Sequence, residues 1–243
     1  MNKPLTLTNV TKSYSAISVL DGVDLTLEPG EFIGLVGVNG AGKTTLIKGI
    51  LDLNRIDSGE IHLFGLSHVL PQSRMNIAYL PERFSPPPYL NGNDYLRYMS
   101  RLHEVAWDSQ QINEVLQALE LDPAGLCRNV RTFSKGMIQK LGLSACILSG
   151  KQLLILDEPM SGLDPQARTC LKNCFHQLKQ AGRSVFMSTH MLADVASVCD
   201  RMMVLHQGRL CYVGTPEGFI EQYGEKDLDR AFVACISRDE GSD

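Results

Sequence analysis

One stretch decides the fold predicted for this chain: Gly37-Val38-Asn39-Gly40-Ala41-Gly42-Lys43-Thr44-Thr45. An apolar run at residues 32–36 precedes them, and a run with helical periodicity at residues 46–53 follows. The sequence therefore predicts a strand, a glycine-rich loop and a helix. Glycines let backbone N–H groups turn inward around phosphates, and the N-terminus of the helix adds a positive dipole end.

Two side chains at the end of this loop fit a nucleoside triphosphate. The Lys43 ammonium can reach the terminal phosphates, and the Thr44 hydroxyl can ligate Mg²⁺. The alternative is a glycine-rich turn with an ordinary surface lysine. The strand before the loop and the helix after it are the context that a phosphate-binding loop requires, so we favour the phosphate-binding interpretation.

The composition limits the class of protein. At 243 residues the chain forms one large domain or two small ones. A hydrophobic content of 44% and a charged content of 21% are typical of soluble globular proteins. The net charge of -4 gives no electrostatic footprint for nucleic acid, and we expect no nucleic-acid partner.

The seven cysteines include no C-x-x-C pair. Cys170 and Cys174 are one helical turn apart, but no further ligand has the spacing of a metal site. Free thiols in a reducing compartment are the favoured interpretation. We expect no signal peptide and no membrane span, so the protein should reach a membrane only by docking on a component already there.

The first part of the chain alternates apolar and polar residues at 5–10 and 23–28, which predicts two half-buried strands. Tyr14 is expected in the loop between them, either as a packing aromatic or as a flat surface for a purine ring. Residues 57–60 should form a turn, followed by a short strand at 61–64. Another short apolar run ends at Pro81-Glu82.

Residues 84–150 have a different character and are expected to form a mainly helical insertion. Helices are predicted after Asn91 and over residues 110–121. Ser134 is placed to cap a third helix, with Lys135 and Gly136 in its first turn. This helix start is either an ordinary N-cap or a second phosphate cradle.

Two carboxylates, Asp157 and Glu158, follow the apolar run 153–156, which is typical of a central parallel strand. Strand alternation would place them on opposite faces. One can then hold Mg²⁺ beside Thr44 while the other faces a water molecule. His190 ends another predicted core strand and should lie at the same edge of the sheet. A hairpin is expected over residues 202–213, and a frayed, charged tail from residue 225.

In this order, from residue 5 to about residue 222, the motifs resemble those of the ATP-binding subunit of an ATP-binding cassette (ABC) transporter. The matching positions are Tyr14 (the adenine-stacking aromatic), residues 37–45 (the Walker A loop), 133–137 (the place of the L-S-G-G-Q signature), 153–158 (the Walker B strand), 161–164 (the D-loop) and His190 (the switch histidine).

The resemblance implies an α/β fold, that of a P-loop NTPase with a mainly parallel core sheet. It also implies one ABC ATPase domain over residues 1–243. Its RecA-like core and N-terminal antiparallel β subdomain would comprise residues 1–83 and 151–222. Residues 84–150 would form an inserted α-helical subdomain, and residues 223–243 a short C-terminal tail.

The resemblance also implies the roles of the site residues. Glu158 would act as general base, His190 would contact the γ-phosphate, and Lys43 would bind the β- and γ-phosphates. Thr44, Asp157 and Glu82 would hold Mg²⁺. The residues expected to bind ATP are Tyr14, Val19, Gly37, Val38, Asn39, Gly40, Ala41, Gly42, Lys43, Thr44, Thr45, Glu82 and Asp157.

Ser134 and Gly136 would bind ATP in trans, because the family sandwiches two ATP molecules between two subunits placed head to tail. The second ATPase subunit would be an identical copy or a homologue. Transmembrane permease subunits would be the other partners, and the protein would lie on the cytoplasmic face of the inner membrane.

Three positions depart from the family pattern. Glu82 stands where the family usually has Gln, and the signature has Lys135 and Met137 in place of Gly and Gln. These variants, and the ending at residues 228–232, resemble bacterial export-type cassettes. We therefore expect an ATPase that powers export of an unidentified substrate.

Two other classes of protein agree with part of the sequence. A non-transport ABC ATPase, acting as a mechanical switch in a soluble assembly machine, would lack a membrane partner. The chain has no basic patch and no long coiled-coil insertion to favour that class, although a component of an iron–sulfur assembly scaffold stays open. A simple P-loop kinase leaves Ser134 and His190 unexplained.

Overall fold

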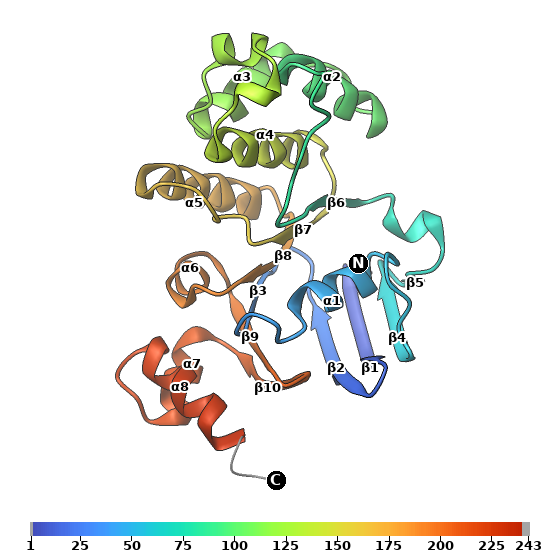
Figure 1. Cartoon of the computed structure of the whole chain (residues 1–243), viewed down its shortest axis with the longest axis vertical. Helices are drawn as coiled ribbons and strands as arrows, with labels where there is room; N and C mark the ends of the chain where they lie inside the picture. The colour runs from blue at the N-terminus through green and yellow to red at the C-terminus, as the bar shows by residue number, and fades with distance from the viewer. Residues whose placement is uncertain (1, 240–243) are drawn as a thin grey trace.

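A computed structural model describes residues 2–239. Near its N-terminus, alternating apolar residues form the long strands β1 (Leu5–Tyr14) and β2 (Ile17–Leu27), which pair antiparallel. β4 (Ser58–Leu63) and the two-residue β5 (Leu66–Ser67) complete a sheet in the order β2-β1-β4-β5. The antiparallel N-terminal sheet predicted from the sequence is confirmed (Figure 1).

The second sheet has six strands in the order β10-β9-β3-β8-β7-β6. All neighbouring strands pair parallel except β9 and β10, which form the expected hairpin. The mainly parallel core sheet is therefore also confirmed. Its strands are β3 (Phe32–Val36), β6 (Ile77–Leu80), β7 (Leu153–Asp157), β8 (Ser184–Thr189), β9 (Arg201–His206) and β10 (Arg209–Gly214).

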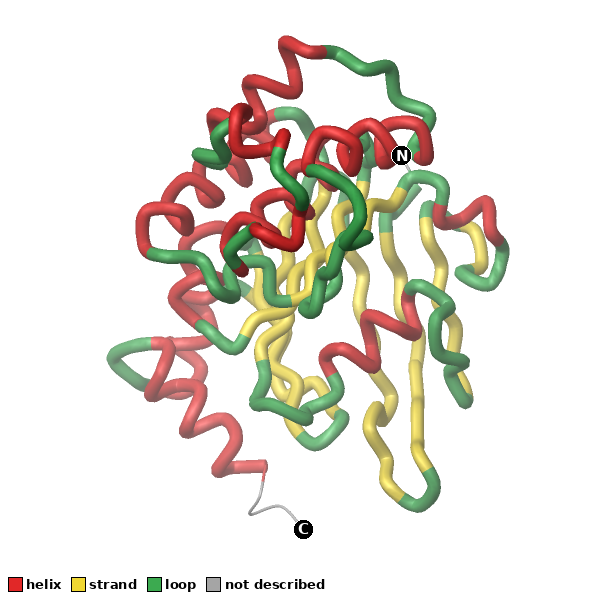
Figure 2. The backbone as a smooth tube through the Cα atoms, turned by 45° about the horizontal axis from the view of Figure 1, so that its top comes forward, coloured by secondary structure: helices red, strands yellow, loops and turns green. Residues whose placement is uncertain are grey.

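Helix α1 (Lys43–Ile50) lies between the two sheets. Its buried residues Leu46, Ile47 and Ile50 share one apolar core with side chains from both sheets. This packing holds the loop before α1 at the carboxyl end of β3. Most of the other helices lie on the side of the molecule away from the antiparallel sheet (Figure 2).

Between β6 and β7 the described chain forms helices and loops, with an apolar core of its own. Asn91 and Asp108 cap the first two helices of this segment with their side chains. We propose that residues 84–150 form a helical subdomain. Its helices are α2 (Gly92–Leu102), α3 (Ser109–Ala118), η2 (Pro123–Cys127), η3 (Val130–Thr132) and α4 (Lys135–Leu148).

Helix α5 (Pro165–Gln180) covers the parallel sheet, where the ring of Phe175 packs edge-on against Phe32. Helices α6 (Leu192–Val198), α7 (Pro216–Tyr223) and α8 (Leu228–Asp239) pack with β9 and β10 around a separate core. Among residues 2–239, no helix is long and apolar enough to cross a membrane.

Three sequence expectations were wrong. The tail after residue 225 is not frayed over its length, because α8 buries Ala231 and Cys235 against the core; residues 240–243 lie outside the described chain. The expected turn at 57–60 is mostly strand, since β4 begins at Ser58 and pairs with β1. Tyr14 belongs to β1, whose pairing with β2 continues to Ile17. A short 3₁₀ turn, η1 (Pro71–Arg74), connects β5 to β6.

Candidate active site

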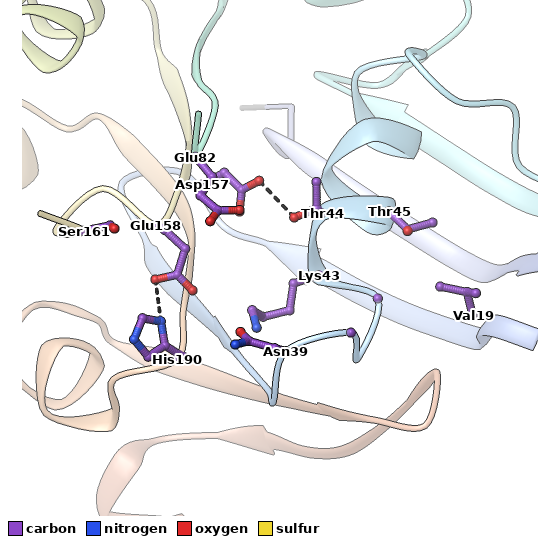
Figure 3. A pocket seen from close by; sticks show the side chains of 12 residues that line it. Val19, Asn39, Lys43, Thr44, Thr45, Glu82, Asp157, Glu158, Ser161 and His190 are labelled. Carbon is purple, nitrogen blue, oxygen red and sulfur yellow. Dashed lines mark hydrogen bonds and ion pairs between the residues drawn. The ribbon is translucent and has the colours of Figure 1, made fainter. Parts of the chain in front are cut away.

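A cavity of about 410 Å³ opens where the loop before α1 meets the carboxyl ends of β7 and β8 (Figure 3). Twelve residues from five separate stretches of the chain line this cavity. They are Val19, Asn39, Gly40, Gly42, Lys43, Thr44, Thr45, Glu82, Asp157, Glu158, Ser161 and His190.

The glycine-rich loop needs Gly42 because of both its conformation and its surroundings. Gly42 has a φ of +107° and immediately precedes α1, and a Cβ there would lie 2.6 Å from the carbonyl oxygen of Val19. Gly40 has a φ of +85°, but a Cβ there would meet no atom within 4 Å. Close packing therefore requires a glycine at position 42, whereas Gly40 leaves the loop backbone open to a ligand.

The Lys43 side chain is buried in this loop. Its ammonium donates hydrogen bonds to the carbonyl oxygens of Gly37, at 2.6 Å, and Val38, at 3.2 Å. Burial lowers the pKa of Lys43, and the negative charges of Glu158, Asp157 and Glu82 act in the opposite direction. The loop therefore holds a cation at the bottom of a cavity that also contains three carboxylates.

Thr44 and Asp157 meet on one side of the cavity, where the Thr44 hydroxyl donates to Oδ2 of Asp157 at 3.1 Å. The other carboxylate oxygen accepts a hydrogen bond from the Ser188 hydroxyl. Tyr79, on the neighbouring strand, has its pKa raised to about 12 by burial and by the charge of Asp157. A hydroxyl and a carboxylate held together in this way are oxygen donors of the kind Mg²⁺ prefers.

The donor set fits a Mg²⁺ ion shared with a phosphate better than an ion bound by protein alone. Within residues 2–239, no cluster of three or more His, Cys, Asp or Glu side chains could hold a metal. Mg²⁺ commonly takes one or two carboxylates and completes its shell with water and substrate phosphates. Asp157 and the nearby Glu82 supply two carboxylates, and Thr44 adds a hydroxyl.

Glu158 and His190 form a second pair in the cavity wall, next to Asp157 (Figure 3). Nδ1 of His190 lies 2.9 Å from Oε2 of Glu158, whose side chain is 11% exposed. The sequence analysis expected strand alternation to place Asp157 and Glu158 on opposite faces of the sheet, and this expectation was wrong. Glu158 follows the end of β7 and has a φ of +52°, and both carboxylates line the same cavity.

The remaining residues of the predicted ATP site lie in different places. Val19, Asn39 and Thr45 line the cavity, while Ala41 is buried within the loop. Tyr14 lies outside the lining; it is 46% exposed, and its hydroxyl accepts a hydrogen bond from the Asn54 amide at 2.9 Å.

Ser134 and Gly136 also lie outside the lining of this cavity. Ser134 caps α4, as the sequence predicts, and its hydroxyl accepts a hydrogen bond from the N–H of Met137 at 3.2 Å. Gly136 faces the loop after β7, because a Cβ there would lie 3.5 Å from the carbonyl oxygen of Gly162.

Sequence reasoning missed the contribution of Ser188. Its hydroxyl donates to Asp157 and also accepts a hydrogen bond from the N–H of Glu158 at 3.1 Å. The only sequence signal is a hydroxyl residue two positions before His190. Ser161 was placed in a loop motif but not in the site, and it lines the cavity.

Comparison with known proteins agrees with this fold. The family described as "ABC transporter" matches residues 20–161. The ABC-type transporter ATP-binding protein EcsA of Bacillus subtilis is 35% identical, with 98% of each chain covered. The Nod factor export ATP-binding protein I of Cupriavidus metallidurans is 32% identical over 91% of this chain and 74% of the relative.

An uncharacterized ABC transporter ATP-binding protein of Nostoc is 37% identical over 81% of this chain, and the match spans 59% of the length of that relative. A solved structure described as the ATP-binding subunit of an ABC transporter superposes with a TM-score of 0.86. It is 30% identical and covers 95% of this chain and 98% of its own. The chain belongs to the ABC transporter family and has the fold of the family's ATP-binding subunits.

Proposed function

We propose that this chain binds and hydrolyses ATP and thereby powers export of a substrate through separate transmembrane subunits. One observation carries the ATPase part of the proposal. A single cavity of about 410 Å³ gathers the loop cation Lys43, the Thr44–Asp157 pair and the Glu158–His190 pair. The cavity therefore contains side chains suited to phosphate binding, to metal binding and to proton transfer.

In the proposed reaction, Lys43 and the N–H groups of its loop bind the β- and γ-phosphates. Thr44, Asp157 and Glu82 would hold Mg²⁺, which neutralises phosphate charge when it is bound. Glu158 accepts a proton from the water whose oxygen attacks the γ-phosphorus. The bond from that phosphorus to the bridging oxygen breaks, which gives ADP and phosphate, while His190 orients Glu158 and the γ-phosphate.

We further propose that the complete site needs a second ATPase subunit. Ser134 is exposed at the start of α4 and, with Gly136, does not line the cavity of its own chain. A helix start with a free face is suited to an anion supplied by another molecule. The second subunit would be an identical copy or a homologue, and Tyr14 would stack on the adenine ring.

The transport part of the proposal has separate support. One relative at 32% identity is named for export of Nod factor, and others are named as transporter ATP-binding proteins. These names favour transport over a non-transport assembly ATPase. The permease subunits would contact the helical subdomain near Tyr89, which is 78% exposed, and would hold the protein at the cytoplasmic face of the inner membrane.

Two variants test the ATPase function. Lys43→Ala should abolish ATP binding, measured by isothermal titration, because the loop loses its only cation; Lys48→Ala, on the exposed side of the same helix, is the matched control. Glu158→Gln should retain ATP binding but lose about 100-fold or more in hydrolysis. Normal hydrolysis by Glu158→Gln would refute the assignment of the base.

Photo-crosslinking tests the transport function. A benzophenone amino acid in place of Tyr89 should crosslink to the membrane-spanning subunit that copurifies with the protein. The same group in place of Ile17, which is 70% exposed on the antiparallel sheet, should not. Absence of a crosslink from position 89 with and without ATP would argue against docking at this surface.

A further inference from the structure

The loop after β7 and the loop after β8 are joined at two points. At their beginnings, Glu158 contacts His190 within the cavity. Further along both loops, outside the cavity, the Arg168 side chain connects them a second time. Arg168 lies in the first turns of α5, directly after the loop that follows Glu158.

Arg168 contacts three groups with one guanidinium. Its Nε donates to the carbonyl oxygen of Leu163 at 3.3 Å, in the loop after β7. Its Nη1 donates to Sδ of Met191 at 3.0 Å, in the loop after β8. The same Nη1 lies 3.7 Å from Oδ2 of Asp194, in the first turn of α6. A planar guanidinium with several fixed N–H groups can serve three partners, which a lysine ammonium on a flexible stem cannot do with the same geometry.

Asp194 gives this contact its strength. The side chain is 4% exposed, and its Oδ2 has no hydrogen-bond partner. Lys172, one helical turn after Arg168, places its ammonium 3.7 Å from Oδ1. A buried carboxylate is costly unless it is paired. The two cations of α5 therefore hold the start of α6 against α5.

Two hydrogen bonds, one to a backbone oxygen and one to a side-chain oxygen, connect Asp194 to the turn that contains His190. The N–H of Asp194 donates to the carbonyl oxygen of Met191 at 3.1 Å, and the N–H of Met191 donates to Oγ1 of Thr189 at 3.0 Å. His190 lies inside this tight turn, with 56% of its side chain exposed. Its ring is thus fixed mainly by the turn and by Glu158.

We propose that Arg168 is a positioning residue for the Glu158–His190 pair. It fixes the loop of Glu158 and the loop of His190 relative to each other, so that the histidine ring stays within hydrogen-bond distance of the carboxylate. Lys172, by contrast, forms its ion pair with Asp194, in α6, and not with a residue of either loop. The proposal rests on the proposed ATPase function, and Lys172 provides a control of nearly equal exposure, 29% against 26%.

The test compares Arg168→Met with Lys172→Met in the purified protein. Both remove one cation beside Asp194, so both should lower the melting temperature. Only Arg168→Met should lower the kcat for ATP hydrolysis, by about 10- to 100-fold, with the KM for ATP changed less than about twofold. Equal kcat values for the two variants would overturn the proposal, because Arg168 would then act only through the charge of Asp194.

Two further variants separate positioning from loss of folding. Arg168→Lys keeps a cation beside Asp194 and should fold, yet its kcat should stay well below that of the wild type; full rescue by lysine would overturn the proposal. In a His190→Ala background, Arg168→Met should lower kcat little further, because both act on the same pair. Additive losses would also overturn it.

A spectroscopic measurement works without turnover. The six histidines, labelled at Cε1, give resonances among which His190 is assigned from His190→Ala. Arg168→Met should shift the His190 resonance, and Lys172→Met should not. An unmoved resonance in Arg168→Met would reject the positioning role even if the wild type hydrolysed ATP. Conversely, if Arg168→Met shifted the His190 resonance but the wild type failed to hydrolyse ATP, only the proposed ATPase function would be rejected.

Discussion

Nδ1 of His190 lies 2.9 Å from Oε2 of Glu158, although the two residues are 32 positions apart in the chain. Each follows the carboxyl end of a parallel strand, and β7 and β8 are neighbours in the sheet. Parallel pairing places the ends of both strands at one edge, which brings together the two loops that carry these side chains. Substitution of either residue should therefore affect the proposed reaction.

His190→Ala should lower the kcat for ATP hydrolysis by about 100-fold, because Glu158 loses the group that orients it and the γ-phosphate loses a donor. ATP binding, measured with a fluorescent analogue, should change little. His176→Ala, on the exposed side of α5, is the matched control. Unimpaired hydrolysis in His190→Ala would show that the contact with Glu158 has no catalytic importance.

Gly42→Ala should abolish ATP binding and lower the melting temperature. The new Cβ would meet the carbonyl oxygen of Val19 at 2.6 Å, at a φ of +107°. Gly182→Ala provides the comparison, since its φ is +71° but no atom lies within 4 Å. That control should cost only about 1 kcal/mol in the free energy of unfolding, from backbone strain. If both variants bound ATP normally, close packing at Gly42 would not matter for the site.

Ser134→Ala and Asp108→Ala separate helix capping from contact in trans. Each variant removes an N-cap side chain, of α4 and α3 respectively, and should cost about 1 kcal/mol in the free energy of unfolding. Only Ser134→Ala should also reduce ATP-dependent dimerisation, measured by analytical ultracentrifugation of the Glu158→Gln protein. Equal dimerisation in the two variants would leave Ser134 with a capping role alone.

Glu82→Gln should raise the Mg²⁺ concentration that gives half-maximal hydrolysis by about three- to tenfold, because a negative charge leaves the cavity. The measurement is ATPase activity against free Mg²⁺ at saturating ATP. Glu60→Gln, on exposed β4, should leave this concentration unchanged. A lower Mg²⁺ requirement in Glu82→Gln would contradict a role for the carboxylate near the ion.

Local sequence was sufficient for much of the site. The Lys43–Thr44 pair is recognisable because a phosphate-binding loop needs consecutive residues with fixed spacing between a strand and a helix. Ser134 was predicted as an N-cap from its place before an apolar helical stretch, and it caps α4. The expectations that failed were those at the margins of elements, where pairing with a distant strand or packing on a distant core decides the outcome. β4 begins early because it pairs with β1, and α8 is ordered because Ala231 and Cys235 find a core.

The sequence by itself determined the phosphate-binding loop, most of the strands, and the residue types that carry the chemistry, because these depend on local spacing and periodicity. Only the tertiary structure decided the contacts themselves and their geometry. Asp157 reaches Thr44, Glu158 reaches His190, and Arg168 reaches Met191 across loops from different strands. Such contacts depend on strand order and on one positive φ at Glu158, and neither leaves a regular pattern in the sequence.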